Sequence, residues 1–278
     1  MATAEPEISV VVVNYNGGPL LLRCLEALQA GRPAPEVILC DNASSDGSLA
    51  AARSAFPDLK VLAFERNLGF AAAVNRGLAA ARGRWLVVLN PDCLVAPDAL
   101  ETLRRAMVEH PRAGLAGCRI LSPDGREQRG SRRRLPDLGG GLAKALGRRG
   151  IDLHQTPPPE APQPVEAISG ACMMVRREAL EEVGGLDEGY FLHCEDLDWC
   201  KRFHDAGWEV LFVPQAGVVH HQGTCSAGRP RRVAWHKHRG MWRYYRKHLA
   251  ADHPWPLRGL VWSGIHLRLL VQWLRGRA

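Results

Sequence analysis

The sequence reads WLVVLNPD over residues 85–92, an apolar run followed at once by a polar turn. Such a run predicts a strand that is buried on both faces, as in a parallel sheet. Pro91 turns the backbone where the strand ends, and the carboxylate of Asp92 follows. In an open α/β sheet, ligands bind beyond the carboxyl ends of the strands, although a single Asp there is also ordinary turn chemistry. The role of Asp92 therefore depends on what the other strands bring to the same edge.

Three similar apolar runs precede this one, and each is followed by a helical pattern. The predicted strands cover residues 8–13, 36–40, 60–64 and 85–89, and the helices that follow them end near residues 30, 55, 81 and 110. Further on, the pattern predicts a strand at 171–176, a helix, a second helix at 195–206 and a strand at 209–213. Strand alternating with helix four times predicts an α/β fold around a mostly parallel sheet.

The segment from about 119 to 165 differs from its surroundings. It contains nine Lys or Arg, including Arg132-Arg133-Arg134, together with three consecutive glycines and three consecutive prolines. A stretch of this composition and length predicts a flexible basic surface segment of the kind that is functional or disordered.

Composition bounds the class of protein. With 278 residues, 46% of them hydrophobic and 23% charged, the chain can fold as a soluble body with one large core and an appendage. None of the eight cysteines forms a Cys-x-x-Cys pair, and several lie in apolar runs, which favours buried reduced thiols over a disulfide framework. Residues 1–7 lack the pattern of a signal peptide, so we expect a cytoplasmic chain. We expect residues 1–228 to form the main domain and 229–278 a helical tail.

The tail is strongly basic. It contains twelve Lys or Arg and one acid, Asp252, interleaved with seven aromatic residues. This pattern indicates an anionic partner, either nucleic acid or a cytoplasmic membrane face. The apolar stretch 257–274 is interrupted by Arg258, His266 and Arg268 and is a poor transmembrane span. As a helix it would either lie in the membrane interface or pack on the body with its arginines in solvent.

Four polar clusters follow the first four predicted strands, at residues 14–18, 41–48, 67–70 and 90–92. Taken singly, each is typical of a turn or a helix cap, and we expect Asp46 and Ser48 to cap the helix that begins there. Together they predict a crevice suited to hydroxyls, a base edge and a diphosphate. No Gly-x-Gly-x-x-Gly or P-loop motif is present, so a metal ion held by Asp92 is the natural way to neutralise a diphosphate.

A second acidic patch, HCEDLDWC at 193–200, begins a predicted amphipathic helix. Acidic residues favour a helix N-terminus, but capping needs only one carboxylate, and three within four residues repel one another. A carboxylate in such a cluster can serve as a general base. Further along, His220-His221 follows a predicted strand, and one of the two histidines could complete a divalent-ion site with Asp92.

In this order and spacing, these segments resemble the inverting glycosyltransferases of family 2, which have the GT-A fold (nucleotide-diphospho-sugar transferase, Rossmann-like). The resemblance runs from residue 8 to about residue 223 and is weakest at 119–165. It rests on ISVVVVNYNG (8–17), VILCDNASSDGS (37–48), NLGFAAAVNRG (67–77), WLVVLNPD (85–92), SGACMMVRREALEEVGGLDEGYF (169–191), EDLDWCKR (195–202) and VPQAGVVH (213–220). The Asn-Pro-Asp form looks most like bacterial rhamnosyltransferases of cell-surface polysaccharide assembly.

The resemblance implies a role for each candidate residue. Asp196 would be the catalytic base that takes the proton from the acceptor hydroxyl, with inversion at the anomeric carbon. Glu195 and Asp198 would lie on the acceptor side and position the acceptor or the helix. Mg²⁺ or Mn²⁺ would stabilise the departing diphosphate, held by Asp92 and His220. The residues implied in donor binding are Asn14, Asn16, Asp41, Asn67, Asn90 and Asp92.

Position 90 departs from the pattern of many relatives, because Asn90 stands where they have Asp and one charge is missing from the metal motif. The implied donor is a nucleotide-diphosphate sugar, with dTDP-rhamnose as the narrower hypothesis, and the implied acceptor is a glycan or a lipid-linked sugar. Two alternatives remain at this point. A nucleotidyltransferase should carry a glycine-rich basic phosphate loop after the first strand, which this sequence lacks. A nucleic-acid-binding protein would leave the carboxylates of the 193–200 patch unexplained, and no nucleic-acid partner is expected.

Overall fold

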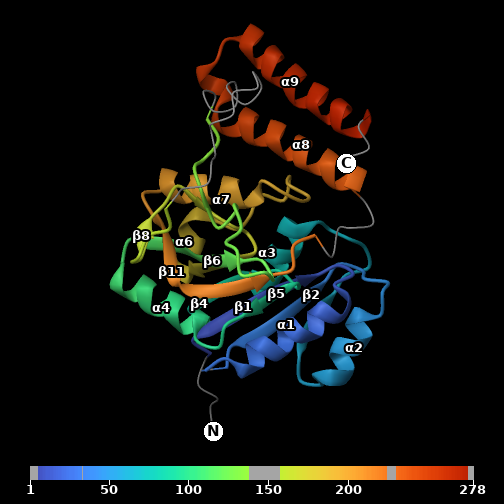
Figure 1. Ribbon diagram of the computed structural model, residues 1–278, viewed down its shortest axis with the longest axis vertical. Helices are drawn as coiled ribbons and strands as arrows, with labels where there is room; N and C mark the ends of the chain where they lie inside the picture. The colour runs from blue at the N-terminus through green and yellow to red at the C-terminus, as the bar shows by residue number, and fades with distance from the viewer. Residues whose placement is uncertain (1–5, 33, 138–156, 224–229, 275–278) are drawn as a thin grey trace.

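The computed structural model describes residues 6–32, 34–137, 157–223 and 230–274. A mixed sheet lies between two layers of helices, and a helical hairpin stands beyond one layer (Figure 1). The main sheet has the order β3-β2-β1-β4-β10-β6-β11-β5, with β8 beside β11, and β7 and β9 form a separate ribbon. The strands are β1 (Ile8–Asn14), β2 (Glu36–Asp41), β3 (Lys60–Ala63), β4 (Trp85–Leu89), β5 (Cys93–Val95), β6 (Ala113–Leu121), β7 (Arg132–Arg133), β8 (Gln163–Pro164), β9 (Ala167–Ile168), β10 (Cys172–Arg176) and β11 (Glu209–His220).

The α/β prediction is confirmed, and β1 to β4 pair in parallel as expected. The sheet becomes mixed at β10, which runs antiparallel to both β4 and β6. Strand β6 was not expected, because its residues are rich in Ala and Gly. The helices are α1 (Gly18–Ala30), α2 (Ser48–Ala55), α3 (Phe70–Ala80), α4 (Ala99–Glu109), α6 (Arg177–Val183), α7 (Glu195–Asp205), α8 (Pro230–His248), the 3₁₀ turn η2 (Ala250–Asp252) and α9 (Trp255–Leu274).

Each face of the sheet packs against its own group of helices because side chains alternate along every strand. Val10 and Val12 of β1 contribute to the core under α1, α2 and α4, which lie on the near side of Figure 1. Val11 and Val13 face the other way, into the core that α3, α6 and α7 cover. Both faces are therefore buried, as the continuous apolar runs predicted.

The described part of the 119–165 segment is more ordered than we expected. Its first residues end β6, and residues 122–131 form a turn that returns to the sheet, where the amide of Ile120 donates to Ser131 Oγ. Arg132 is fully buried, pairs with Glu127 and lies over the ring of Phe212. A buried arginine is tolerated here because its charge is paired, which composition alone does not reveal. Residues 138–156 lie outside the described part.

The tail folds as the α8–α9 hairpin at the top of Figure 1, with α8 next to α7 and α9 outermost. The last four residues lie outside the described part. No residue of α9 is buried, and α9 packs against α8. None of the described helices has both the length and the hydropathy that crossing a membrane requires. The seven described cysteines are free thiols, as predicted, and Cys225 is outside the described residues.

Candidate active site

The carboxyl ends of β1 and β2 supply the first part of the site. Asn14 and Asp41 are partners in the parallel register, and Asn14 Nδ2 donates to Asp41 Oδ1 at 2.8 Å. The same amide group donates to Ser44 and Ser48, while its oxygen accepts from the Gly17 amide. Asn14 and Asp41 are both buried, so their contacts shape the loops above them.

These loops are closed by further contacts of Asn16, a predicted donor residue, and of Asp46, a predicted helix cap. Asn16 adopts a left-handed conformation (φ 55°), and its side-chain oxygen accepts from the Ser45 amide at 2.8 Å. Asp46 accepts from the amide and hydroxyl of Ser48 and from the Gly18 amide. Burial alone would raise the pKa of Asp46, but these hydrogen bonds outweigh it and the pKa is lowered. Asp46 thus joins the start of α2 to the start of α1.

Asn67 shapes the turn into α3, where its side-chain oxygen accepts from the Gly69 amide at 2.8 Å. Gly69 has a φ of +89°, and a Cβ there would lie 2.9 Å from Phe191. Only glycine permits this close approach. The Gly69 carbonyl in turn accepts from Asn42 Nδ2, which ties the turn to the end of β2.

Asp92, just after β4, and His220, the last residue of β11, lie side by side. Asp92 Oδ1 lies 3.3 Å from His220 Nε2, and both side chains are nearly buried. His220 Nδ1 contacts Gln128 Oε1 at 3.0 Å, and Gln128 Nε2 donates to the His220 carbonyl at 2.8 Å. Because Gln128 presents an oxygen to Nδ1, the tautomer that fits this contact has its proton on Nδ1 and directs the Nε2 lone pair at Asp92.

Two acceptors in contact repel one another unless a cation lies between them or the imidazole is protonated. The residues present thus fit a divalent ion held by a carboxylate oxygen and an imidazole nitrogen. Cys93 Sγ also lies in this group. Burial, followed by the nearby charge of Asp92, raises the pKa of the Cys93 thiol well above its usual value, and its Sγ contacts the Ala171 carbonyl at 3.5 Å.

Asp196 lies in the first turn of α7, close to this corner. Its Oδ2 accepts from the Gly170 amide at 3.2 Å and from Arg133 Nη2 at 2.5 Å. The next residue, Ala171, accepts from the amide of Asn90 at 3.0 Å. Two consecutive residues therefore link Asp196 to the Asn90-Pro91-Asp92 turn, and the structure brings the predicted base and the predicted metal corner together.

Glu195 and Asp198 lie in different surroundings. Glu195 is buried, and its Oε2 has no hydrogen-bond partner within the described chain. Burial, and then the charge of Asp196, raise the pKa of Glu195 to about 8, so it is protonated at neutral pH. Asp198 is fully buried and accepts from Arg202, Lys247 and His248. Its contacts tie α8 to α7, which is of the helix-positioning kind, one of the two roles that the resemblance implied for Asp198.

Two residues near the candidate groups were not anticipated from the sequence. Gln128 orients His220, and Arg133 contacts Asp196, yet both lie in the segment that composition assigned to a flexible surface. Their only sequence signal was the basic, polar character of that segment.

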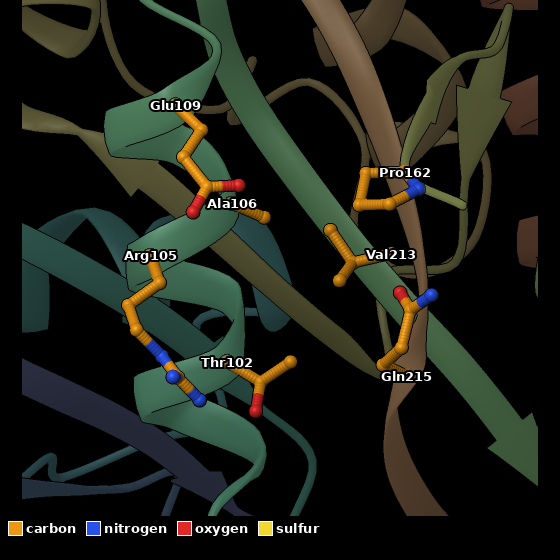
Figure 2. A pocket seen from close by; sticks show the side chains of 7 residues that line it. All are labelled: Thr102, Arg105, Ala106, Glu109, Pro162, Val213 and Gln215. Carbon is orange, nitrogen blue, oxygen red and sulfur yellow. The ribbon is translucent and has the colours of Figure 1, made fainter.

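A separate hollow of about 220 Å³ lies between α4 and β11, on the opposite face of the sheet from α7. Figure 2 shows Arg105 and Glu109 on α4 facing Gln215 and Pro162 across it. None of the candidate site residues lines this hollow, so the site described above does not depend on it.

Comparison with known proteins identifies the family and the fold. The profile of "Glycosyl transferase family 2" matches residues 9–184. The N-acetylglucosaminyl-diphospho-decaprenol L-rhamnosyltransferase of Mycobacterium tuberculosis is 33% identical over 97% of this chain and 95% of its own length. The rhamnosyltransferase WbbL of Escherichia coli is 26% identical over 77% of this chain and 83% of its own.

A solved structure resembles the fold. It is the mannosyltransferase PcManGT of Pyrobaculum calidifontis in complex with GDP-Man and Mn²⁺, with a TM-score of 0.60. It is 23% identical, and the match covers 98% of this chain and 72% of that one. The overall architecture is thus the GT-A fold that the sequence led us to expect.

Proposed function

The chain belongs to glycosyl transferase family 2, and from that premise we propose that it transfers L-rhamnose from dTDP-rhamnose to a hydroxyl of a lipid-linked or glycan acceptor, with inversion. The observation that carries the proposal is the short link between Asp196 and the Asn90-Pro91-Asp92 turn through Gly170 and Ala171. A single displacement requires a general base next to the site that binds the donor diphosphate, and this link would hold Asp196 next to the turn that contains Asp92. The choice of rhamnose is supported by the two rhamnosyltransferase relatives.

In this mechanism Asp196 takes the proton from the acceptor hydroxyl as its oxygen attacks the anomeric carbon. The bond from that carbon to the diphosphate oxygen breaks on the opposite side, so one displacement inverts the centre. Asp92 and His220 would hold Mg²⁺ or Mn²⁺, and such an ion neutralises the charge that develops on the diphosphate. The loops tied by Asn14 and Asp41 would enclose the nucleotide, with Asn16, Asn67 and Asn90 around them.

We also propose that α9 attaches the enzyme to the cytoplasmic membrane face, where a lipid-linked acceptor resides. Seven large apolar side chains of α9 are between 38% and 82% exposed: Trp255, Leu260, Trp262, Leu267, Leu270, Trp273 and Leu274. At 3.6 residues per turn they fall within an arc of about 160°, which contains no Lys, Arg, Asp or Glu. A soluble surface rarely leaves so continuous an apolar face uncovered.

Charge supports a lipid surface over nucleic acid as the occupant of this face. The α8–α9 hairpin has a single acid, Asp252, and exposed cations that include Arg231, Arg239 and Arg268. Cations beside an apolar face match an anionic lipid interface, in which the apolar side chains enter the acyl boundary. Nucleic acid would leave the apolar arc in water.

Vesicle sedimentation tests the membrane proposal. We expect the chain to sediment with vesicles that contain phosphatidylglycerol, and the Leu267→Glu, Leu270→Glu double variant to remain in the supernatant. Val108→Glu is the matched control, because Val108 is 53% exposed on α4, away from the hairpin. Equal sedimentation of the double variant and the control would contradict a role for the α9 face.

Transfer itself is tested with a panel of nucleotide sugars in the presence and absence of Mn²⁺, reading thermal stabilisation and donor turnover. We expect stabilisation by dTDP-rhamnose to exceed that by UDP-sugars. The alternative of a nucleotidyltransferase predicts release of inorganic pyrophosphate from a nucleoside triphosphate and a sugar phosphate. No response to any nucleotide sugar would overturn the proposed function.

A further inference from the structure

The carboxylate of Asp196 is already engaged by a cation. Arg133 Nη2 lies 2.5 Å from Asp196 Oδ2, and no other ion pair of Asp196 occurs among the described residues. The charge of Asp196 raises the pKa of Arg133 although burial lowers it, so the guanidinium stays charged. A strong charge-assisted contact therefore occupies the group that should act as the base.

The hydrogen-bonding positions of Asp196 are largely filled. Oδ2 accepts from Arg133 and from the Gly170 amide, and Oδ1 accepts from the Leu197 amide at 2.8 Å. A general base must come within hydrogen-bond reach of the proton that it removes. An acceptor hydroxyl that approaches Oδ2 must consequently displace Arg133, since the Gly170 amide is fixed in the backbone.

Arg133 has one unpaired hydrogen-bond donor. Its Nε is buried and has no hydrogen-bond partner in the described part of the chain. Its strand, β7, is anchored by Arg132, which pairs with Glu127, and by pairing with β9. The backbone is thus held in place, and besides Asp196 the guanidinium makes only a long contact, from Nη2 to the Ile168 carbonyl at 3.4 Å, among the described residues. A guanidinium edge of two N–H groups binds a phosphate in a bidentate manner, which would satisfy the buried Nε.

We propose that Arg133 recognises a phosphate group of the acceptor and, in turning to it, releases Asp196 for catalysis. This inference rests on the proposed function. The contact between Arg133 and Asp196 then keeps the base engaged in the absence of an acceptor, which limits transfer of the sugar to water. We assign the donor diphosphate to the metal ion that Asp92 and His220 would hold, which leaves Arg133 for the phosphate of the acceptor.

The step is balanced without any proton from Arg133. The acceptor O–H proton passes to Asp196, the acceptor oxygen bonds to the anomeric carbon, and the bond to the donor diphosphate breaks. Arg133 remains protonated throughout and exchanges one anionic partner for another. Its contribution is to couple acceptor binding to the availability of the base.

Two substitutions and two acceptors test the inference. The probes are N-acetylglucosaminyl diphosphate on a short prenyl chain and the same sugar on a phosphate-free alkyl chain, with donor hydrolysis measured without acceptor. For Arg133→Gln we expect kcat/KM on the diphosphate probe to fall tenfold or more, mainly through KM, and hydrolysis to rise severalfold. Arg133→Lys should be intermediate because it keeps the charge but loses the fork. Arg134→Gln, the exposed neighbour, is the control and should match the wild type.

The outcomes are distinguishable. A fall in hydrolysis parallel to the fall in transfer would show that Arg133 only supports the fold or the base, and would overturn the inference. An equal loss on both acceptors would overturn it as well. If the wild type transfers no sugar to either probe or to water, the proposed function fails, and the inference fails with it. A thermal melt of each variant confirms that it folds.

Discussion

Asp198 provides the sharpest stability prediction, because this fully buried carboxylate pairs with two residues of the tail, Lys247 and His248. Its side chain is 0% exposed, with Lys247 Nζ at 2.7 Å, His248 Nε2 at 2.8 Å and Arg202 Nε at 2.9 Å. Burial by itself would raise the pKa of Asp198. Hydrogen bonds from His248 and Lys247, together with Arg202, outweigh burial and hold the pKa well below its usual range.

Asp198→Asn removes the negative charge and leaves the cations around it. Loss of one partner of a buried ion pair costs about 3–5 kcal/mol. The lower end applies here, because Lys247 keeps Asp187 and Arg202 keeps two carbonyl oxygens as partners. At about 2 °C per kcal/mol for a chain of this size, a loss of about 3 kcal/mol lowers Tm by about 6 °C.

Urea unfolding followed by tryptophan fluorescence measures this loss at pH 7. Asp205→Asn is the matched control, since Asp205 is on the same helix, its side chain is 53% exposed, and Lys201 is its only ion-pair partner among the described residues. An exposed pair of this kind contributes about 0–1 kcal/mol. If Asp198→Asn is no less stable than Asp205→Asn, the assignment of Asp198 as the link between α7 and α8 is refuted.

Three further predictions concern acid stability, a buried acid and the metal corner. Asp187 and Asp198 both have a lowered pKa, because their hydrogen bonds to the cations of α8 outweigh burial. Both carboxylates therefore stabilise the fold above about pH 3.9, the pKa of an unfolded Asp, and this contribution should be lost as the pH falls below that value. The acid unfolding curve of the wild type should accordingly be steeper than that of Asp198→Asn. Burial raises the pKa of Glu195 to about 8, so the wild type should lose stability as the pH rises from about 5 to 8, by at most about 1.4 kcal/mol per pH unit. In urea unfolding at several pH values, Glu195→Gln should show a flatter dependence of stability on pH. An unchanged dependence would contradict the burial of Glu195 as a neutral acid. Gln128→Ala should weaken Mn²⁺ binding about 10–100-fold in calorimetry, because His220 loses the contact that orients it, and unchanged affinity would count against the assigned ligand pair.

The parts of the fold that could be predicted are those with a local signal. The strands β1, β2 and β4 are continuous apolar runs, and their polar ends fall at one edge of the sheet by the geometry of parallel strands. Strand β6 was missed because Ala113–Leu121 is rich in small residues without β-branched runs. The antiparallel insertion of β10 depends on a long-range pairing that periodicity does not encode.

The candidate site residues that belong to a sequence motif could be proposed from the sequence. The residues that contact them from distant parts of the chain could not. Asp92, Asp196 and His220 stood out at strand or helix ends. Arg133 reaches Asp196 across 63 residues of sequence, and Gln128 reaches His220 across 92. The partners of Asp198 in α8 could not be foreseen either, because they lie about 50 residues further along the chain. Each of these contacts arises from tertiary packing of polar side chains whose local sequence is ordinary.

The most direct test of the central claim compares sugar transfer by the wild type and by Asp196→Asn with dTDP-rhamnose, Mn²⁺ and the diphosphate acceptor probe. Loss of a general base should lower kcat by about 10²–10⁴-fold while donor binding and Tm are kept. The product of the wild type should have the anomeric configuration opposite to that of the donor, as read by NMR. Near-normal transfer by Asp196→Asn, or a product with retained configuration, would contradict the account.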